Sequence, residues 1–206
     1  MTIQPIVEGY GEVDTVPVLL RRLQDEIAAY DFKIGRPIRR KRSELSTEEQ
    51  VRRSVRLALG TPECCGVLIL FDSDDACPKD FGPTVQNWAQ AEAGAIPCEV
   101  VLAHREYEAW FIAAIESLRG VRGVMLDAMS HPTPEGVRDC KGTLEEKMLV
   151  GASYSPRVDQ AAFTAQVDLR QAHRTCRSFR RMTRAFGNLV EAAGFELQAW
   201  PPAAWL

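Results

Sequence analysis

The chain has 206 residues, which suffices for one well-buried α/β domain with an appendage and is too few for two comfortable domains. Its 25 Lys and Arg residues and 28 Asp and Glu residues give a net charge of -3, which excludes a globally basic nucleic-acid-coating protein and a polyacidic chain. With 46% hydrophobic and 26% charged residues, the composition is that of an ordinary globular protein. Any nucleic-acid site must therefore be a local patch.

Features of membrane or disulfide-rich proteins are missing. No apolar run approaches the roughly 20 residues that cross a bilayer, and the first residues lack the basic start and apolar stretch of a signal peptide. The six cysteines contain no Cys-x-x-Cys pair, so neither a zinc ribbon nor a disulfide scaffold is predicted. We therefore expect a cytoplasmic protein with reduced thiols and no membrane partner.

The first half of the chain alternates short apolar runs with helical patterns, which is typical of parallel β-α-β units. Between the runs, apolar residues recur at three- and four-residue spacing, as on the buried face of a helix. We therefore predict an α/β fold with a parallel sheet of about four strands flanked by helices. The predicted strands cover residues 3–7, 32–38, 66–71 and 98–103, and the predicted helices cover residues 13–27, 47–60 and 85–95.

The second half begins irregularly and then becomes helical. Residues 119–142 are rich in glycine and proline and predict a long loop or lid. Residues 159–169 predict a helix, and one long helix is predicted from there to about residue 193. We therefore divide the chain into an α/β core, residues 1–118, and a lid loop with a helical C-terminal extension, residues 119–206, packed on the core as one structural domain.

Acidic residues directly follow three of the four predicted strands, at the edge where open parallel sheets bind their ligands. Carboxylates gathered at neighbouring strand ends repel one another unless a cation lies among them. Mg²⁺ and Mn²⁺ prefer oxygen ligands, so the pattern predicts one of these ions as a cofactor. The residues predicted to hold the metal are Glu8, Asp72, Asp74 and Glu108.

Alternatives stay open at this edge. Asp75 can replace Asp74, and Glu106 can replace Glu108. Glu106 and Glu108 lie two residues apart, so on a regular helix they cannot both face the site. The carboxylates can also be purely structural, since the helix dipole favours negative charge at helix N-termini. The sequence alone does not choose between these interpretations.

A stripe of arginines is predicted on the last long helix. At about 100° per residue the arginines share one narrow face, opposite apolar residues that pack against the protein. Guanidinium groups bind phosphate oxygens in pairs, so the stripe fits a nucleic-acid backbone. A solvated face, or one paired with acids elsewhere, is the alternative. The stripe consists of Arg170, Arg174, Arg177, Arg181 and Arg184, and a basic run at residues 36–42 adds to it slightly.

Other catalytic signatures are missing. The chain has no phosphate-binding P-loop, no His-Glu-x-x-His and no Gly-x-Ser-x-Gly, which argues against a P-loop ATPase, a zincin and an α/β-hydrolase. The Asp-x-Asp at residues 72–74 also fits a phosphatase or a nucleotide-sugar enzyme. Ala76, however, stands where an aspartyl-phosphate phosphatase has Thr or Val.

Two acidic motifs carry a family resemblance. A strand that ends in Glu8-Gly9 and a later strand that ends in Asp-x-Asp resemble the Toprim domain of topoisomerases, primases and OLD-type nucleases. Residues 105–111 are similar to the Arg-Glu-x-Glu-Asn-Tyr segment of the OLD-type branch, with Ala109 in place of Asn. Nearly the whole chain resembles the bacterial Toprim-like family catalogued as domain of unknown function 4276, whose Tyr-Ser-Pro segment and Arg-rich helix recur at residues 154–156 and around 178–179.

The resemblance implies a Toprim-like sheet and assigns roles to individual residues. Glu8, together with the Asp-x-Asp at residues 72–74, would bind the metal, and Glu12 and Glu108 would add to the acidic site. Lys141 would be the lysine that Toprim nucleases place near the scissile phosphate. Members of the family are often encoded beside ATPases in antiphage settings, which implies an ATPase partner.

Two functional hypotheses follow. The first is a Mg²⁺- or Mn²⁺-dependent phosphodiester-cleaving enzyme with Glu8, Glu12 and Lys141 as catalytic residues and nucleic acid held by the arginine stripe. The second is a non-catalytic module of the same fold that docks a partner ATPase through its arginine-rich helix.

Overall fold

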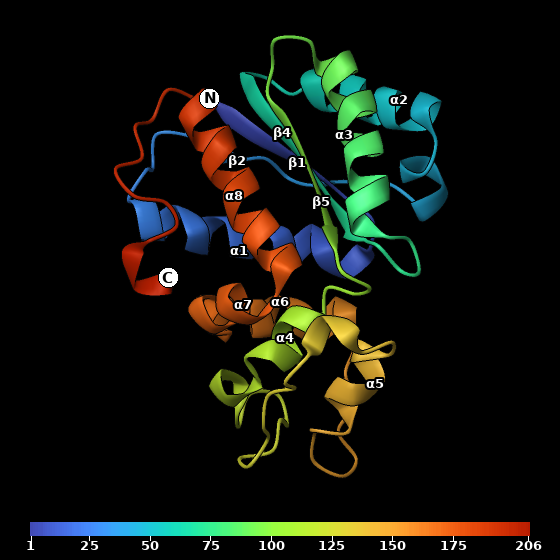
Figure 1. Cartoon of the computed structure of the whole chain (residues 1–206), viewed down its shortest axis with the longest axis vertical. Coiled ribbons are helices and arrows are strands. Elements are labelled where there is room, and N and C mark those ends of the chain that lie inside the picture. The colour runs from blue at the N-terminus through green and yellow to red at the C-terminus, as the bar shows by residue number, and fades with distance from the viewer.

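The computed structural model describes residues 1–206 and contains one parallel sheet (Figure 1). All strand pairs are parallel, in the order β2-β1-β4-β5, with β3 also pairing with β1. The predicted α/β fold with a parallel sheet flanked by helices is therefore confirmed. The strands are β1 (Thr2–Val7), β2 (Lys33–Ile34), β3 (Ile38–Arg39), β4 (Cys64–Asp72) and β5 (Cys98–Ala103).

The second predicted strand, residues 32–38, is wrong as a single element. Two short strands, β2 and β3, replace it, and both pair with β1. Pro37 between them has no N–H to give to a ladder. The side chain of Gln4 fills the interruption, because its Nε2 donates to the carbonyl of Arg36 at 2.8 Å.

Helices cover both faces of the sheet. Figure 1 shows α1 and α8 on one face and α2 and α3 on the other. Residues of the central strand β4 alternate between the two cores, so β4 is buried on both sides. The helices are α1 (Tyr10–Ile27), α2 (Glu48–Leu59), α3 (Pro78–Ala93), α4 (Ala109–Ala113), α5 (Cys140–Glu145), α6 (Pro156–Gln166), α7 (Leu169–Thr175) and α8 (Arg177–Ala192). None of them has the length and apolar composition needed to cross a membrane.

A group of short helices, α4 to α7, lies beyond the carboxyl ends of the strands (Figure 1). The Gly- and Pro-rich segment 119–142 is fastened to this group rather than standing free. The amide of His131 donates to the carbonyl of Ile112 in α4 at 2.9 Å, and within the segment the guanidinium of Arg119 donates to the carbonyl of Ala128 at 2.9 Å. Helix α5 begins within the predicted loop, at Cys140.

The predicted single long helix at the C-terminus is wrong. The chain is extended at Cys176 (φ -104°, ψ 122°), which separates α7 from α8. The carboxylate of Glu135 accepts hydrogen bonds from the amides of Arg177 and Ser178 at 2.9 and 2.7 Å, so a loop acid caps the new helix N-terminus. Because the helix axis changes at this break, the arginines do not form the one continuous stripe that the sequence predicts.

The packing of α1 against α6 depends on a glycine. A Cβ on Gly11 would lie 2.6 Å from the carbonyl oxygen of Pro156 and 2.5 Å from the side-chain oxygen of Gln160. We expect Gly11→Ala to lower the free energy of unfolding by about 1–3 kcal/mol, measured by urea denaturation. Gly82→Ala in α3 is the matched control, because its nearest neighbour is 3.9 Å away, and it should be neutral or raise stability by up to about 1 kcal/mol. Equal effects of the two substitutions would contradict this packing.

Candidate functional site

Four carboxylates gather at the carboxyl edge of the sheet. Glu8 directly follows β1, Asp72 ends β4, and Glu108 follows β5, while Glu12 lies in the first turn of α1. They are close enough that Glu8, Glu12 and Glu108 all raise the pKa of Asp72, after the larger effect of burial. We call these four residues the carboxylate cluster. The parallel topology thus brings together side chains that are up to 100 positions apart in the sequence.

Glu108 is the most buried member, with 1% of its surface exposed. Its Oε1 accepts a hydrogen bond from the hydroxyl of Tyr154 at 2.9 Å and a longer one from Nε2 of Gln160 at 3.5 Å. Burial raises the pKa of Glu108, although the ammonium of Lys141 and the Tyr154 hydroxyl oppose this. Its second oxygen, Oε2, is buried and has no hydrogen-bond donor.

Lys141 brings a positive charge to the cluster from the first turn of α5. Its Nζ lies 3.3 Å from Oε2 of Glu106 and 3.6 Å from Oε2 of Glu108. Burial by itself lowers the pKa of Lys141, but the carboxylates of Glu108, Asp72 and Glu106 together raise it above its ordinary value. The ammonium therefore stays charged at neutral pH and lowers the pKa of Glu108 and of Asp72.

Asp72 is anchored by the backbone that follows β5. The amide of Tyr107 donates to Oδ1 of Asp72 at 2.8 Å. The Tyr107 side chain is buried, and its hydroxyl lies 3.1 Å from the hydroxyl of Thr164 in α6. The ends of β4 and β5 are thus held together directly beneath α6, and burial with the neighbouring acids raises the pKa of Asp72 well above its ordinary value.

Glu12 and Glu8 complete the cluster on the β1 side. Oε2 of Glu12 accepts a short hydrogen bond from the amide of Gly9. Burial, with the charges of Glu108 and Glu8, raises the pKa of Glu12 from 4.5 to about 7. Burial also raises the pKa of Glu8, and Oε2 of Glu8 has no hydrogen-bond donor. All four carboxyl groups therefore hold their protons more tightly than they would in water.

The positions left open by the sequence differ in their surroundings. Asp74 is exposed and pairs with Arg42, whose Nε is 3.3 Å from Oδ2 of Asp74. Asp75 is more exposed still and pairs with Arg105 at 3.5 Å. Of the two, Asp74 is near enough to raise the pKa of Glu8, so it lies at the margin of the cluster.

Both acids after β5 contact Lys141, so the sequence alternatives Glu106 and Glu108 are neighbours here. Glu108 faces the cluster, because it is buried and acts on the pKa of Asp72 and Glu12. Glu106 also accepts a hydrogen bond from the backbone amide of Lys141 at 3.3 Å, so it helps to fix the start of α5.

Sequence reasoning missed the donors that hold Glu108. Tyr154 stands in a Tyr-Ser-Pro segment that the family resemblance had marked, but without a role. Gln160 carried no signal, because a single glutamine on a helix is unremarkable. In the structure Gln160 links Glu108 to Thr15 of α1, whose hydroxyl is 3.3 Å from Oε1 of Gln160.

The five predicted arginines divide between two helices, α7 and α8. Arg181 is neutralised, since its Nη2 lies 2.6 Å from Oε2 of Glu99 in β5. The other four are exposed and form no salt bridge: Arg170, Arg174, Arg177 and Arg184.

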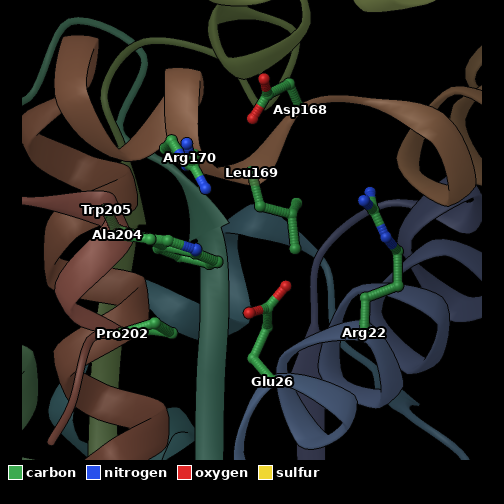
Figure 2. A pocket seen from close by; sticks show the side chains of 8 residues that line it. All are labelled: Arg22, Glu26, Asp168, Leu169, Arg170, Pro202, Ala204 and Trp205. Atoms are coloured by element: carbon green, nitrogen blue, oxygen red, sulfur yellow. The ribbon is translucent and has the colours of Figure 1, made fainter.

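Arg170 lines a pocket at one end of α1 (Figure 2). The charged side chains that line the pocket are two arginines, Arg22 and Arg170, and two acids, Glu26 and Asp168. The guanidinium of Arg22 is already bound to two backbone carbonyls at 2.8 and 2.7 Å. No member of the carboxylate cluster lines this pocket, so it is separate from the cluster.

The cluster fits a divalent cation in its chemistry. In the structure, no group of three His, Cys, Asp or Glu side chains surrounds a common metal position. Oε2 of Glu8 has no hydrogen-bond donor, Oε2 of Glu108 is paired with the ammonium of Lys141 at 3.6 Å, and burial is the largest cause that raises the pKa of all four acids. Carboxylate oxygens are the ligands of Mg²⁺ and Mn²⁺, so such an ion would bind here after the side chains turn toward it.

These observations define an α/β protein whose parallel sheet carries a buried carboxylate cluster and one lysine at its carboxyl edge. The family model described as Domain of unknown function (DUF4276) matches residues 7–186, and the chain belongs to this family. The expected membership in domain of unknown function 4276 is thereby confirmed, whereas the relation to the Toprim domain stays a prediction. No curated protein matches the chain, and no solved structure matches it either.

The raised pKa of Glu12 predicts a pH-dependent stability for the metal-free protein. The unfolded chain loses this proton near pH 4.5 and the folded chain near pH 7, so the free energy of unfolding should fall as the pH rises between these values. Glu12→Gln keeps an oxygen for the Gly9 amide and should remove roughly 3 kcal/mol of that fall. Urea denaturation across this range measures it, with the exposed Asp14→Asn on the same helix as control. An unchanged slope in Glu12→Gln would contradict the assignment.

The contact between Lys141 and the buried Glu108 predicts a coupled pair. Lys141→Met should lower the free energy of unfolding by about 2 kcal/mol at pH 8 and by less at pH 5, where the carboxyls are protonated. In a Glu108→Gln background the same substitution should cost much less. The exposed Lys79→Met is the control. Equal losses in both backgrounds would show that Lys141 does not compensate the charge of Glu108.

Proposed function

We propose that this protein is a Mg²⁺- or Mn²⁺-dependent enzyme of the Toprim type that cleaves phosphodiester bonds in nucleic acid. The proposal rests on one observation: the carboxylate cluster and Lys141 meet at the carboxyl edge of a parallel sheet, and Oε2 of Glu8 is buried there without a hydrogen-bond donor. The order of the motifs, which resembles the Toprim domain of OLD-type nucleases, supports it. That resemblance also supports a place beside an ATPase in bacterial antiphage defence.

Four acids would hold the cation, and Oε2 of Glu8 is the one buried oxygen among them with neither a donor nor a salt bridge. Glu8 and Asp72 stand at adjacent strand ends, Glu108 is buried behind them, and Asp74 lies at the margin. When bound, a divalent cation polarises the phosphate and lowers the pKa of a water molecule. Ligation would also neutralise part of the charge that now raises the pKa of each acid.

The remaining residues suggest how protons and charge are handled. Glu12 is buried in the first turn of α1, four residues after Glu8, and would act as the general base that takes a proton from water. Lys141, which keeps its charge, would attract the phosphate and balance its negative oxygens. Tyr154 and Gln160 would keep Glu108 in place without touching the substrate.

Metal binding and cleavage can be tested on the same variants. We expect Mn²⁺ at 100 times its Kd to raise the free energy of unfolding by about 2.7 kcal/mol. Asp72→Asn and Glu8→Gln should lose this response, because each removes a carboxylate ligand of the ion. Glu12→Gln should slow the Mn²⁺-dependent cleavage of labelled DNA or RNA by roughly 100- to 10,000-fold. The control Asp75→Asn, whose side chain contacts only Arg105, should bind metal and cleave as the parent does.

The proposal fails if the parent protein neither gains stability with Mn²⁺ nor cleaves any strand, or if the cluster variants cleave as well as the parent. That result would favour a second candidate, a non-catalytic module that docks a partner ATPase. The observation behind it is the set of exposed arginines without salt bridges on α7 and α8. Reversing the charge at Arg174 and Arg184 would then release a co-purifying ATPase.

A further inference from the structure

An exposed aromatic ring that carries two arginines lies beside the carboxylate cluster. Tyr10, the first residue of α1, has 59% of its surface exposed. The guanidinium carbon Cζ of Arg39 lies 3.9 Å from the centroid of its ring, and Cζ of Arg157 lies 5.1 Å from the same centroid. Neither guanidinium forms a salt bridge with a carboxylate, so both charges are free for an anion from outside.

Two chain segments tie this group to the cluster. Tyr10 follows Glu8 by two residues, and Nη1 of Arg39 donates to the backbone carbonyl of Glu8 at 3.4 Å. Arg157 follows Tyr154 by three residues, and the Tyr154 hydroxyl is the donor that holds Glu108. The same two segments therefore position cluster residues and the arginine-bearing ring.

The chemistry of the group matches single-stranded nucleic acid. Guanidinium groups bind phosphate oxygens, and unpaired bases stack on aromatic rings and on guanidinium planes. A duplex keeps its bases paired and offers only its backbone to such a surface. A phosphate alone would need the arginines but would gain nothing from an exposed ring.

We propose that Tyr10, Arg39 and Arg157 form a binding site for single-stranded nucleic acid that places one of its phosphates at the carboxylate cluster. The inference rests on the proposed function, because the cluster is where the phosphodiester bond would be cut. It names a strand-binding site on β3, α1 and α6 that shares Arg39 with the basic run at residues 36–42 and does not use the arginines of α7 and α8.

Binding is measured without cleavage, by fluorescence anisotropy in EDTA with a labelled mixed-sequence single strand of about 20 nucleotides and its duplex. The parent should bind the single strand more tightly than the duplex. Arg39→Gln with Arg157→Gln should lower the magnitude of the slope of log K against log salt by about 1.4, since about 0.7 is expected for each phosphate contact. Tyr10→Ala should weaken binding roughly 5- to 150-fold, while Tyr10→Phe keeps the ring and should bind nearly as the parent does.

The control removes two exposed arginines elsewhere, Arg21→Gln with Arg53→Gln, and should leave the affinity and the salt slope close to those of the parent. Arg157→Gln alone leaves the partly buried Arg39 in place and changes only an exposed residue of α6, so it should not disturb folding. It should produce about half of the change in salt slope expected for the double variant. The inference is overturned if the parent does not bind single strands, or if the Tyr10 and arginine variants bind like the parent. Loss of binding in these variants, with no Mn²⁺-dependent cleavage by the parent, would uphold this site and reject the proposed nuclease activity.

Discussion

The buried carboxylates at the carboxyl edge of the sheet need nearby positive charge and hydrogen-bond donors, and much of the fold serves to supply them. Burying carboxylates near one another is costly, because each loses water and repels the others. The protein offsets this with the ammonium of Lys141, with the guanidinium of Arg42 near Glu8, and with donors such as the Tyr154 hydroxyl and the Tyr107 amide. Burial still raises the pKa of all four acids above its ordinary value.

This constraint explains why the second half of the chain is more than an appendage. The strand ends and the first turn of α1 supply the acids, but Lys141 comes from α5, Tyr154 from the segment before α6, and Gln160 from α6 itself. Helix α6 also packs on α1 so closely that Gly11 leaves no room for a side chain. The site is therefore completed only when the helices beyond the strand ends close over the sheet, and local packing and site geometry stabilise each other.

Much of the sheet and of the cluster could be predicted from the sequence, because both rest on short-range patterns. The apolar run of β4 predicts a strand buried on both faces, and parallel pairing then brings Asp72 close to Glu8. The interruption between β2 and β3 and the break at Cys176 could not be predicted in this way. They depend on Gln4 and Glu135, whose side chains satisfy backbone groups more than 30 residues away in the sequence.

The electrostatic partners were beyond the sequence for the same reason. Arg181 belongs to the predicted arginine stripe, but its contact with Glu99 crosses from α8 to β5 and removes it from the free charges. Conversely, Arg39 and Arg157 stand in unrelated segments, and only the fold brings them to the ring of Tyr10. Which charges are free and which are paired is decided by tertiary contacts, and that distinction separates a binding surface from an ordinary polar one.

We propose that the carboxylate cluster binds Mg²⁺ or Mn²⁺, and anomalous diffraction from Mn²⁺-soaked crystals is the decisive measurement. We expect an anomalous peak at about 2.0–2.2 Å from oxygens of Glu8 and Asp72, with the Glu108 side chain turned toward the ion. An empty cluster at saturating Mn²⁺, with the ammonium of Lys141 still between Glu106 and Glu108, would contradict it.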